Sequence, residues 1–327
     1  RQFYSRRKST KSPCRNNNFG INMNKRFFYS ANEYYKEIFG SKVYKIALNL
    51  GTTCPTRDGT KDTRGCIFCS NAGSGDFAFS DLERAKSLVS KKIKSGERKF
   101  LAYFQSFTNT YGKTPEEEKK LVEKYKAVLE DSEIVGIVIG TRPDSISDWI
   151  LGEIGKIAEN HYVSIELGFQ TSNENTASYI RRHFSNEEYF DAIKRIKATN
   201  QNIHVVTHLI FGLPFETESD MLNSVETAIK AQTDGIKIAL LHVLKNTDLA
   251  TDFYTGKFSV MEKEEYFEIL GKTLAIIPEN VVIHRLTGDG PKSLLIAPLW
   301  TANKKDVMNS MMRYFEDNGI FQGSENS

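Results

Sequence analysis

The sequence predicts an α/β fold, a partial (β/α)6 barrel that ends in an additional strand and helix. The first observation is a set of six apolar runs rich in Val, Ile, Leu and Phe, at 43–50, 100–105, 135–140, 163–170, 204–212 and 236–243. Nearly continuous apolarity is typical of strands that are buried on both faces of a parallel sheet. A doubly wound sheet is the alternative arrangement of such βα units.

The second observation is that helix start signals lie between these runs. Capping-box patterns, in which a Ser or Thr precedes an acidic residue by three positions, occur at 30–33, 80–83, 185–188 and 217–220. Thr114 followed by Pro115 marks another helix start. The helix that begins at Ser30 is predicted to end near Gly40, and further helices are predicted near 144–159 and 303–317.

The third observation is that polar or glycine residues follow each apolar run directly. These short segments are 51–54, 105–109, 141–144, 170–172, 212–214 and His242. In parallel barrels the chemistry lies at the C-terminal ends of the strands. We therefore expect the functional side chains of this protein at that end of the barrel.

Composition limits the classes of protein that fit. The chain has 327 residues, 39% of them hydrophobic, which is enough to bury a substantial core in one large domain or two modest ones. Of its 44 basic residues, six lie in 1–22, where there is no acid, which leaves 38 basic against 41 acidic residues in the body. A nucleic-acid site is therefore expected only as a local patch, not as a globally basic surface.

The same features give an expected organisation and location. Four cysteines argue against a disulfide scaffold, and no apolar run approaches the ~18 residues of a membrane span, so we expect a cytoplasmic protein without a membrane segment. Residues 1–22 are predicted to be a disordered basic tail or upstream sequence. Residues 23–275 are predicted to form the barrel, and 276–327 an extension that packs on the barrel and serves as a substrate-binding element.

Three cysteines, Cys54, Cys66 and Cys69, follow the first apolar run and are separated by eleven and two residues. Cubane iron–sulfur clusters usually take four thiolates, so three suggest a cluster with one iron left open for another ligand. The close pair also suits zinc, but a structural zinc site needs four ligands and the nearest histidine is His161. Reduced structural thiols are a third interpretation. Cys14 is not expected to be a ligand, which excludes a second all-cysteine cluster.

A three-cysteine loop after the first strand of a βα barrel resembles the radical S-adenosylmethionine (SAM) superfamily. Within it, the chain resembles the YhcC/YtqA family, which is related to the catalytic subunit of elongator. The resemblance lies in NLGTTCPTRDGT at 49–60, GCIFC at 65–69, THLIFGLP at 207–214 and HRLTGDGPK at 284–292. It extends from about Met23 to the C-terminal helix, and it implies a radical SAM type of partial barrel.

The resemblance also implies a chemistry. A reduced [4Fe–4S] cluster held by Cys54, Cys66 and Cys69, the catalytic and metal-binding residues, would donate an electron to SAM. The resulting 5′-deoxyadenosyl radical would take a hydrogen atom from the substrate. A reducing electron donor such as flavodoxin or ferredoxin is an implied partner. The residues that would contact SAM are Gln105, Ser106, Thr108, Thr141, Arg142, Glu166, Gln170, Arg181 and His208. Residues 105–109 depart from the superfamily's glycine-rich loop.

Several of these side chains have a purely structural interpretation. Glu166 suits an interior ion pair with Lys237, Arg182 suits the surface, and His204 suits packing. His242 fits packing and the barrel mouth equally. The aromatic residues Phe27, Phe28, Tyr29, Tyr34, Tyr35 and Phe39 favour a hydrophobic cover over a base-stacking platform.

The substrate hypothesis rests on the resemblance and on polar residues near the C-terminus. Cations contact phosphates and aromatic rings stack on bases. The candidate substrate residues are Lys237, His242, Arg285, Asp289, Lys292 and Trp300. The resemblance implies that tRNA is the partner and that the C5 side chain of the wobble uridine is modified, with carboxymethylaminomethyl shortened to aminomethyl. A small-molecule or protein substrate is one alternative, and a zinc-containing, non-catalytic RNA-binding protein is another.

Overall fold

The computed structural model describes residues 27–73, 75–91, 93, 96–288 and 290–325. Its main sheet has seven strands in the order β1-β2-β3-β4-β5-β6-β8, and every neighbouring pair is parallel. These strands are β1 (Tyr44–Leu48), β2 (Phe100–Phe104), β3 (Ile134–Thr141), β4 (Tyr162–Gln170), β5 (His204–Phe211), β6 (Gly235–Leu240) and β8 (Val282–Arg285). A small antiparallel pair joins β7 (Val243–Leu244) to β9 (Leu295–Ala297). The six predicted strands are confirmed, and the strand of the extension joins the same sheet.

Helices alternate with the strands as predicted. They are α1 (Ala31–Phe39), α2 (Leu82–Ser90), α3 (Pro115–Val128), α4 (Asp148–Ile157), α5 (Glu174–Tyr179), α6 (Asn186–Thr199), α7 (Glu218–Lys230), α8 (Asp248–Tyr254), α9 (Lys263–Ile276) and α10 (Lys304–Asp317). Capping boxes at Ser30, Ser185 and Thr217 are confirmed. The predicted cap at Ser80 is wrong by one residue, because the side chain of Asp81 accepts the hydrogen bond from the Arg84 amide.

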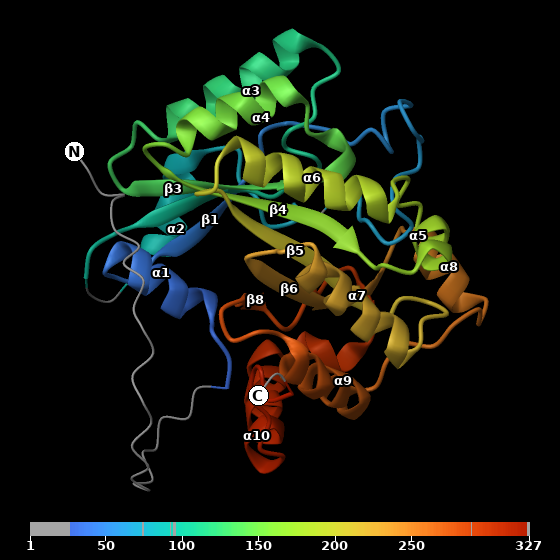
Figure 1. Cartoon of the computed structure of the whole chain (residues 1–327). Helices are drawn as coiled ribbons and strands as arrows, with labels where there is room; N and C mark the ends of the chain where they lie inside the picture. The colour runs from blue at the N-terminus through green and yellow to red at the C-terminus, as the bar shows by residue number, and fades with distance from the viewer. Residues whose placement is uncertain (1–26, 74, 92, 94–95, 289, 326–327) are drawn as a thin grey trace, which may run out of the picture.

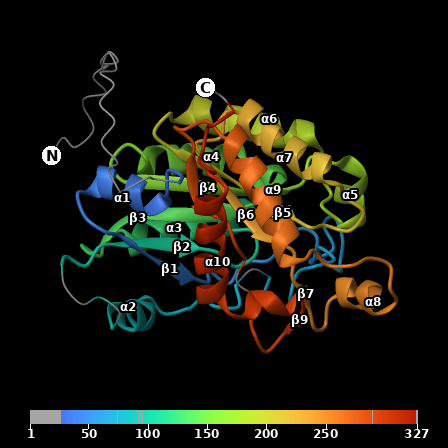
Figure 2. The ribbon, with the colours of Figure 1, turned by 90° about the horizontal axis from the view of Figure 1, so that it is seen from below.

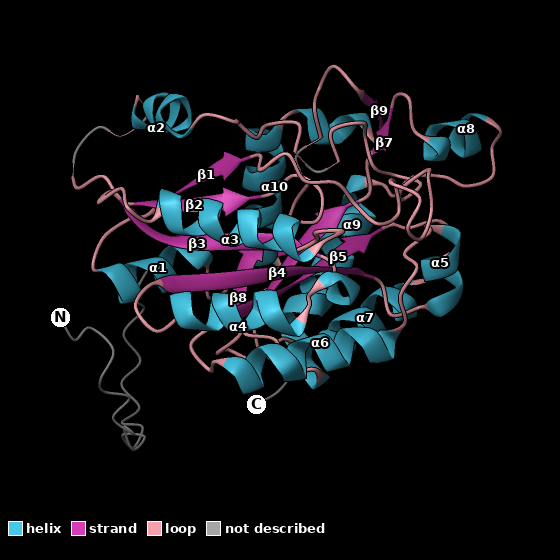
Figure 3. Cartoon of the chain, turned by 90° about the horizontal axis from the view of Figure 1, so that it is seen from above, coloured by secondary structure: helices cyan, strands magenta, loops and turns pink. Residues whose placement is uncertain are grey.

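The sheet curls into a half-barrel whose convex face is covered by helices. Figure 1 shows α3, α4, α6, α7 and α9 outside the curled sheet, with α1 at the end where the strands begin. The strand arrowheads point toward α5 and α8 (Figure 3). The predicted partial barrel is therefore confirmed, and the doubly wound sheet is excluded.

Alternation along the strands separates an apolar outside from a polar inside. In β4, Ile165 and Leu167 are fully buried in the large core that the outer helices complete. Glu166 and Gly168 face the other way and line an internal cavity. Successive side chains of a strand point to opposite faces, so one apolar run supplies both the core and the polar interior.

The half-barrel stays open between its two edge strands, β1 and β8. At the end where the strands begin, the segment before α1 bridges this opening, since Ser30 pairs with Ile283 in parallel and the Ile283 amide donates to the Tyr29 carbonyl at 2.8 Å. Further along, α10 packs against the core through the fully buried Met311 and Phe315. Figure 2 shows α10 in front of the sheet.

The aromatic residues of α1 close the bottom of the barrel. Tyr35 packs with Val43 and Tyr162, and Phe39 lies against the same cluster. The Tyr34 ring stacks on His204, with ring centroids 4.5 Å apart. For these residues the predicted hydrophobic cover is confirmed, and so is the packing role of His204. Among the described residues no helix is both long and apolar enough to cross a membrane.

Two glycines differ in the space that a methyl group would find. A Cβ on Gly136 in β3 would lie 2.4 Å from the Tyr162 carbonyl oxygen, whereas one on Gly152 in α4 would meet nothing within 4 Å. We expect Gly136→Ala to lower the free energy of unfolding by about 1–3 kcal/mol through overpacking. Gly152→Ala should raise it by about 0.5–1 kcal/mol because alanine favours helices. Urea unfolding of both variants checks this, and equal midpoints for the two would contradict it.

Candidate functional site

A cavity of about 230 Å³ opens at the C-terminal ends of the strands. Its walls come from the loop after β1 and from the inward side chains of β2 to β8. The cavity brings together most of the residues proposed from the sequence: Cys54, Cys66, Cys69, Gln105, Thr108, Thr141, Arg142, Glu166, Gln170, His208, Lys237 and Arg285.

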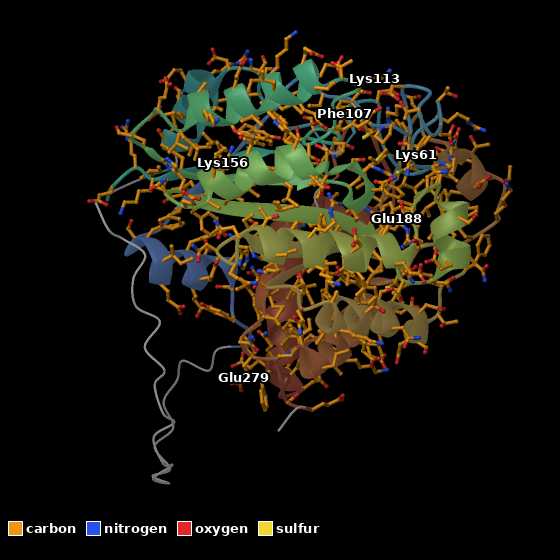
Figure 4. All side chains as sticks on the ribbon, turned by 45° about the horizontal axis from the view of Figure 1, so that its top comes forward. Lys61, Phe107, Lys113, Lys156, Glu188 and Glu279 are labelled. Atoms are coloured by element: carbon orange, nitrogen blue, oxygen red, sulfur yellow. The ribbon has the colours of Figure 1, made fainter. Side chains whose placement is uncertain are left out.

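The cysteine loop folds back on itself so that its thiols share one wall. The Gly65 amide donates to the Thr56 carbonyl at 2.7 Å, and Gly65 has a φ of 73°, which suits glycine. Arg57 then fastens the second half of the loop, since its Nη2 donates to the Ser70 carbonyl at 2.7 Å and to the Cys69 carbonyl at 3.3 Å. Figure 4 shows Lys61, from this loop, and Phe107 at the same end of the molecule, with Lys156 at the other.

The three thiols differ in how readily they ionise. The hydrogen bond with Cys66 and burial raise the pKa of Cys69 well above its usual value. A hydrogen bond with Cys69 lowers the pKa of the Cys66 thiol, and Arg142 and Arg57 lower it further against the effect of burial. Burial raises the pKa of Cys54, whose Sγ lies 3.0 Å from the Thr108 hydroxyl. Cations close to thiols favour the thiolate that binds iron.

The three thiols on the cavity wall are one donor short of a structural zinc site. In the described part of the chain, no three His, Cys, Asp or Glu side chains are grouped so as to hold a single metal ion. An iron–sulfur cluster offers a separate iron to each thiolate, whereas structural zinc needs four donors around one ion. The donor set on the cavity wall therefore matches the cluster.

Arg142 is held at the cavity wall in one orientation. Its Nε and Nη2 donate to the two carboxylate oxygens of Asp144 at 2.9 and 2.7 Å, and Nη2 also donates to the Arg182 carbonyl at 2.7 Å. The bidentate carboxylate contact fixes the guanidinium plane. Arg182, which we expected at the surface, is only 1% exposed, because its guanidinium donates to the Thr171 and Phe184 carbonyls.

Glu166 is the centre of a charged cluster on the cavity floor. Its carboxylate accepts from Lys45 and Lys237 at 2.7 Å each, and His208 Nε2 lies 2.7 Å away. The interior ion pair with Lys237 is therefore confirmed. Lys237 also donates to the Tyr103 hydroxyl at 2.9 Å.

The Glu166 carboxylate lies within hydrogen-bond distance of Lys45, Lys237 and His208, and burial of this cluster shifts the pKa values of its members. Burial alone would raise the pKa of Glu166, but Lys237, Lys45 and His208 outweigh it and hold that pKa well below its usual range. Burial lowers the pKa of His208 to about 4 and that of Lys237 to about 7. His208 is therefore neutral at pH 7 and hydrogen-bonds the carboxylate without adding charge.

Five of the proposed residues lie away from this cavity. Ser106 is fully buried beneath it, and no partner of its hydroxyl is found among the described residues. Arg181 does not line the cavity; its guanidinium pairs with Asp248 and its carbonyl lies 3.8 Å from Cys66 Sγ. His242 lines a neighbouring cavity, with Nε2 3.1 Å from the Thr301 hydroxyl. The remaining two are Lys292 and Trp300, and a further candidate, Asp289, lies outside the described residues.

Lys292 and Trp300 are also separated from the cavity. Lys292 is exposed on the turn before β9. Trp300 packs against Tyr266 and Phe267, and its Nε1 donates to the Met261 carbonyl at 3.2 Å. These contacts give Trp300 a packing role between the extension and α9.

Sequence reasoning missed several residues that shape the site. Arg57 lines the cavity and holds the cysteine loop, and its only signal was its place between two cysteines. Tyr103 and Lys45 face inward from β2 and β1, where period-two alternation would have identified them. Asp144 was part of a noted strand end, but its contact with Arg142 depends on local folding.

The chain matches two domain families that together cover most of it. Residues 54–228 match the Radical SAM superfamily, and residues 233–317 match the Radical_SAM C-terminal domain. With a half-barrel and a three-cysteine loop at its mouth, the chain belongs to the radical SAM superfamily and is an enzyme of that class. Enzymes of this superfamily use a [4Fe–4S] cluster and SAM.

Full-length relatives place the chain more narrowly. It is 36% identical to YtqA of Bacillus subtilis (strain 168) over 315 residues, which cover 94% of this chain and 95% of YtqA. It is 32% identical to YhcC of Escherichia coli (strain K12) over 290 residues, covering 88% and 91% of the two chains. The chain is therefore a member of the YhcC/YtqA family.

More distant similarities cover part of larger proteins. The solved structure of the Methanocaldococcus infernus Elp3 with an N-terminal deletion superposes with a TM-score of 0.61 at 18% identity, covering 85% of this chain and 63% of that one, which supports the fold. A Methanocaldococcus jannaschii protein named tRNA uridine(34) acetyltransferase is 24% identical over 189 residues, 57% of this chain and 34% of that protein.

The neutral state of His208 predicts how stability depends on pH. An unfolded imidazole takes up a proton near pH 6.5, whereas burial in the folded state lowers the pKa to about 4. The unfolded chain thus binds more protons between these values, so stability falls as the pH falls through this range. Between pH 6.5 and 5 we expect this group to cost about 1–2 kcal/mol.

The His208→Gln variant should lack that part of the pH dependence, because an amide donates to Glu166 without titrating. Urea unfolding of cluster-free wild type and variant at both pH values measures the difference. An equal loss of stability in the two proteins on acidification would contradict the prediction.

Proposed function

We propose that this radical SAM enzyme modifies the C5 side chain of the wobble uridine of a tRNA. The observation that carries the proposal is the charge of the cavity. Its described walls contain Arg57, Arg142, Lys237 and Arg285; Arg142 is paired with Asp144 and Lys237 with Glu166, so Arg57 and Arg285 carry the unbalanced positive charge. A negatively charged ligand suits such a cavity, because a buried charge needs a partner of opposite sign.

The distant relatives suggest which kind of molecule this negatively charged ligand is. The name of the Methanocaldococcus jannaschii relative, tRNA uridine(34) acetyltransferase, specifies uridine 34 of tRNA as its target, and its similarity covers 57% of this chain. The Elp3 structure supports the same half-barrel fold. The named target of that relative supports a tRNA substrate for this family member. We also propose a reducing donor such as flavodoxin or ferredoxin as electron source and the cytoplasm as location.

We further infer that Cys54, Cys66 and Cys69 hold the cluster. When bound, the cluster supplies the electron that cleaves SAM. The chain's own part is to present three thiolates on a wall that Arg57 keeps folded. Thr141, Gln170 and the fixed Arg142 line the adjoining space and offer a hydroxyl, an amide and a guanidinium to the amino-acid end of SAM.

The specific step we propose is oxidative shortening of carboxymethylaminomethyl to aminomethyl. Loss of a hydrogen atom and one further electron from the carboxymethyl carbon, with SAM as the net oxidant, would give an imine, and water would break its carbon–nitrogen bond to release the aminomethyl group and glyoxylate. That substituent ends in a carboxylate, for which Arg285 and Lys237 are suitable partners. Nε of Arg285 is buried and has no hydrogen-bond partner among the described residues. The cavity floor therefore offers a charged donor that an anionic substituent would satisfy.

Replacing single cysteines tests the cluster assignment. Cys54→Ala, Cys66→Ala and Cys69→Ala should each abolish cluster assembly and the release of 5′-deoxyadenosine. The loop supplies only three thiolates, and each substitution would leave two to hold the cluster. Cys14→Ala is the matched control and should keep both. Iron and sulfide analysis and SAM cleavage after anaerobic reconstitution measure the outcome. Full activity without Cys66 would refute the assignment.

Nucleoside mass spectrometry tests the substrate. tRNA bearing carboxymethylaminomethyluridine, incubated with reconstituted enzyme, SAM and reductant, should lose that nucleoside and gain the aminomethyl form. The Cys66→Ala protein is the control and should leave the tRNA unchanged. An unaltered wobble-uridine profile with an enzyme that still cleaves SAM would favour a small-molecule or protein substrate instead.

A further inference from the structure

Lys237 and Arg285 lie side by side on the floor of the cavity. They are partners in the parallel register of β6 and β8, which are neighbours in the sheet (Figure 1). Both line the cavity that contains the thiol wall. Glu166 is the single carboxylate among the described residues that line this cavity, and Lys45 also bonds to it. The cations on the floor therefore outnumber the carboxylates.

The shared carboxylate leaves Lys237 easy to deprotonate. Burial lowers the pKa of Lys237, Glu166 opposes this effect, and Arg285 and Lys45 add to it, so that the pKa falls to about 7. For Lys45, burial is outweighed by Glu166, and the pKa is raised. His208, the neighbour of Lys237 in register on β5, is neutral and adds no charge. Lys237 is therefore the lysine of this cluster that becomes neutral near pH 7.

Two hydrogen bonds fix the Lys237 amine. It donates to Glu166 Oε2 at 2.7 Å and to the Tyr103 hydroxyl at 2.9 Å, from β4 and β2 respectively. A neutral amine has two N–H groups and one lone pair, so these two bonds leave the lone pair for a ligand. A desolvated lysine beside another cation is the kind of amine that forms Schiff bases with carbonyl compounds.

Arg285 supplies a matching anion site next to this amine. Its Nε is buried and has no hydrogen-bond partner among the described residues. A buried donor without a partner is costly, so the group is suited to a ligand that accepts its hydrogen bond. A guanidinium binds a carboxylate through two parallel hydrogen bonds. An amine lone pair beside a guanidinium matches an α-oxo acid, in which a carbonyl group adjoins a carboxylate.

We propose that Lys237 forms a Schiff base with the α-oxo acid glyoxylate, whose carboxylate Arg285 holds. The proposal rests on the proposed function, because glyoxylate is the fragment that shortening of carboxymethylaminomethyl would release. It gives Lys237 a covalent role in that release.

The release then has two stages. The Lys237 amine adds to the carbon of the protonated substrate imine, a proton moves from the Lys237 nitrogen to the substrate nitrogen, and the bond between that carbon and the substrate nitrogen breaks. The aminomethyl group leaves as a neutral amine, and the protonated imine is now on Lys237. Water adds to this imine and releases glyoxylate and the Lys237 ammonium. The sum consumes one water, as direct hydrolysis would.

Reductive trapping tests the site without tRNA. Reconstituted protein incubated anaerobically at pH 7 with glyoxylate and cyanoborohydride should gain a carboxymethyl group on Lys237, which peptide mass spectrometry locates. The exposed Lys194 on α6 is the control within the same molecule. Because an ordinary lysine amine is almost wholly protonated at pH 7, we expect Lys237 to be labelled at least about tenfold faster.

Arg285→Gln separates an α-oxo acid site from a lysine that is merely reactive. Wild-type Lys237 should be labelled faster by glyoxylate than by acetaldehyde, because acetaldehyde lacks the carboxylate. The variant should lose this preference while Lys237 is still labelled, and the ratio of the two rates cancels any change in the reactivity of the amine. Circular dichroism and iron content verify that the variant is folded and carries its cluster.

The outcomes separate the Schiff-base site from the proposed function. Labelling of Lys237 no faster than that of Lys194, or the same ratio of rates in wild type and Arg285→Gln, would overturn the site. If the enzyme still shortens the tRNA nucleoside in that case, the proposed function stands. Labelling as expected with an enzyme that leaves tRNA unaltered would support the α-oxo acid site and overturn the tRNA function.

Discussion

The interior of this half-barrel depends on one carboxylate. Glu166 is 1% exposed and accepts hydrogen bonds from Lys45 on β1 and Lys237 on β6, with His208 on β5 as its third neighbour. These contacts connect strands from both halves of the sheet across the inside of the barrel. A buried ion pair is costly to break, because the remaining charge is left without a partner in a medium of low dielectric constant. The cluster therefore fixes the curvature of the sheet at the floor of the cavity.

The same cluster supports the chemistry assigned to the cavity. Glu166 offsets the charge of Lys45 and Lys237, whereas no ion pair of Arg57 or Arg285 is found among the described residues, so these two arginines give the cavity walls their positive charge. Arg57 and Arg142 extend this field to the thiol wall, where they favour thiolates. Positively charged side chains therefore extend from the barrel floor to the cysteine loop.

The open side of the sheet makes the site accessible from outside the barrel. A closed eight-stranded barrel fills its interior with side chains. Here β1 and β8 do not pair, so the interior is reachable from the side, and the cations of both edges face that opening. A substrate much larger than the cavity can therefore present one group to it.

The sequence by itself determined the class of fold and the centre of the site. Continuous apolar runs predicted the strands because a sheet covered on both faces needs them, and the three cysteines predicted the cluster because thiolates are its ligands. Period-two alternation would also have identified Lys45 and Tyr103 as inward-facing.

Only the tertiary structure decided which polar residues meet. The contacts of Glu166 with Lys45 and of Arg142 with the Arg182 carbonyl join positions far apart in the chain, so no local pattern records them. The structure likewise placed Trp300 in packing and Arg285 in the wall of the cavity. Local pattern specifies which face a side chain occupies, whereas its partner depends on how the curled sheet brings distant strands together.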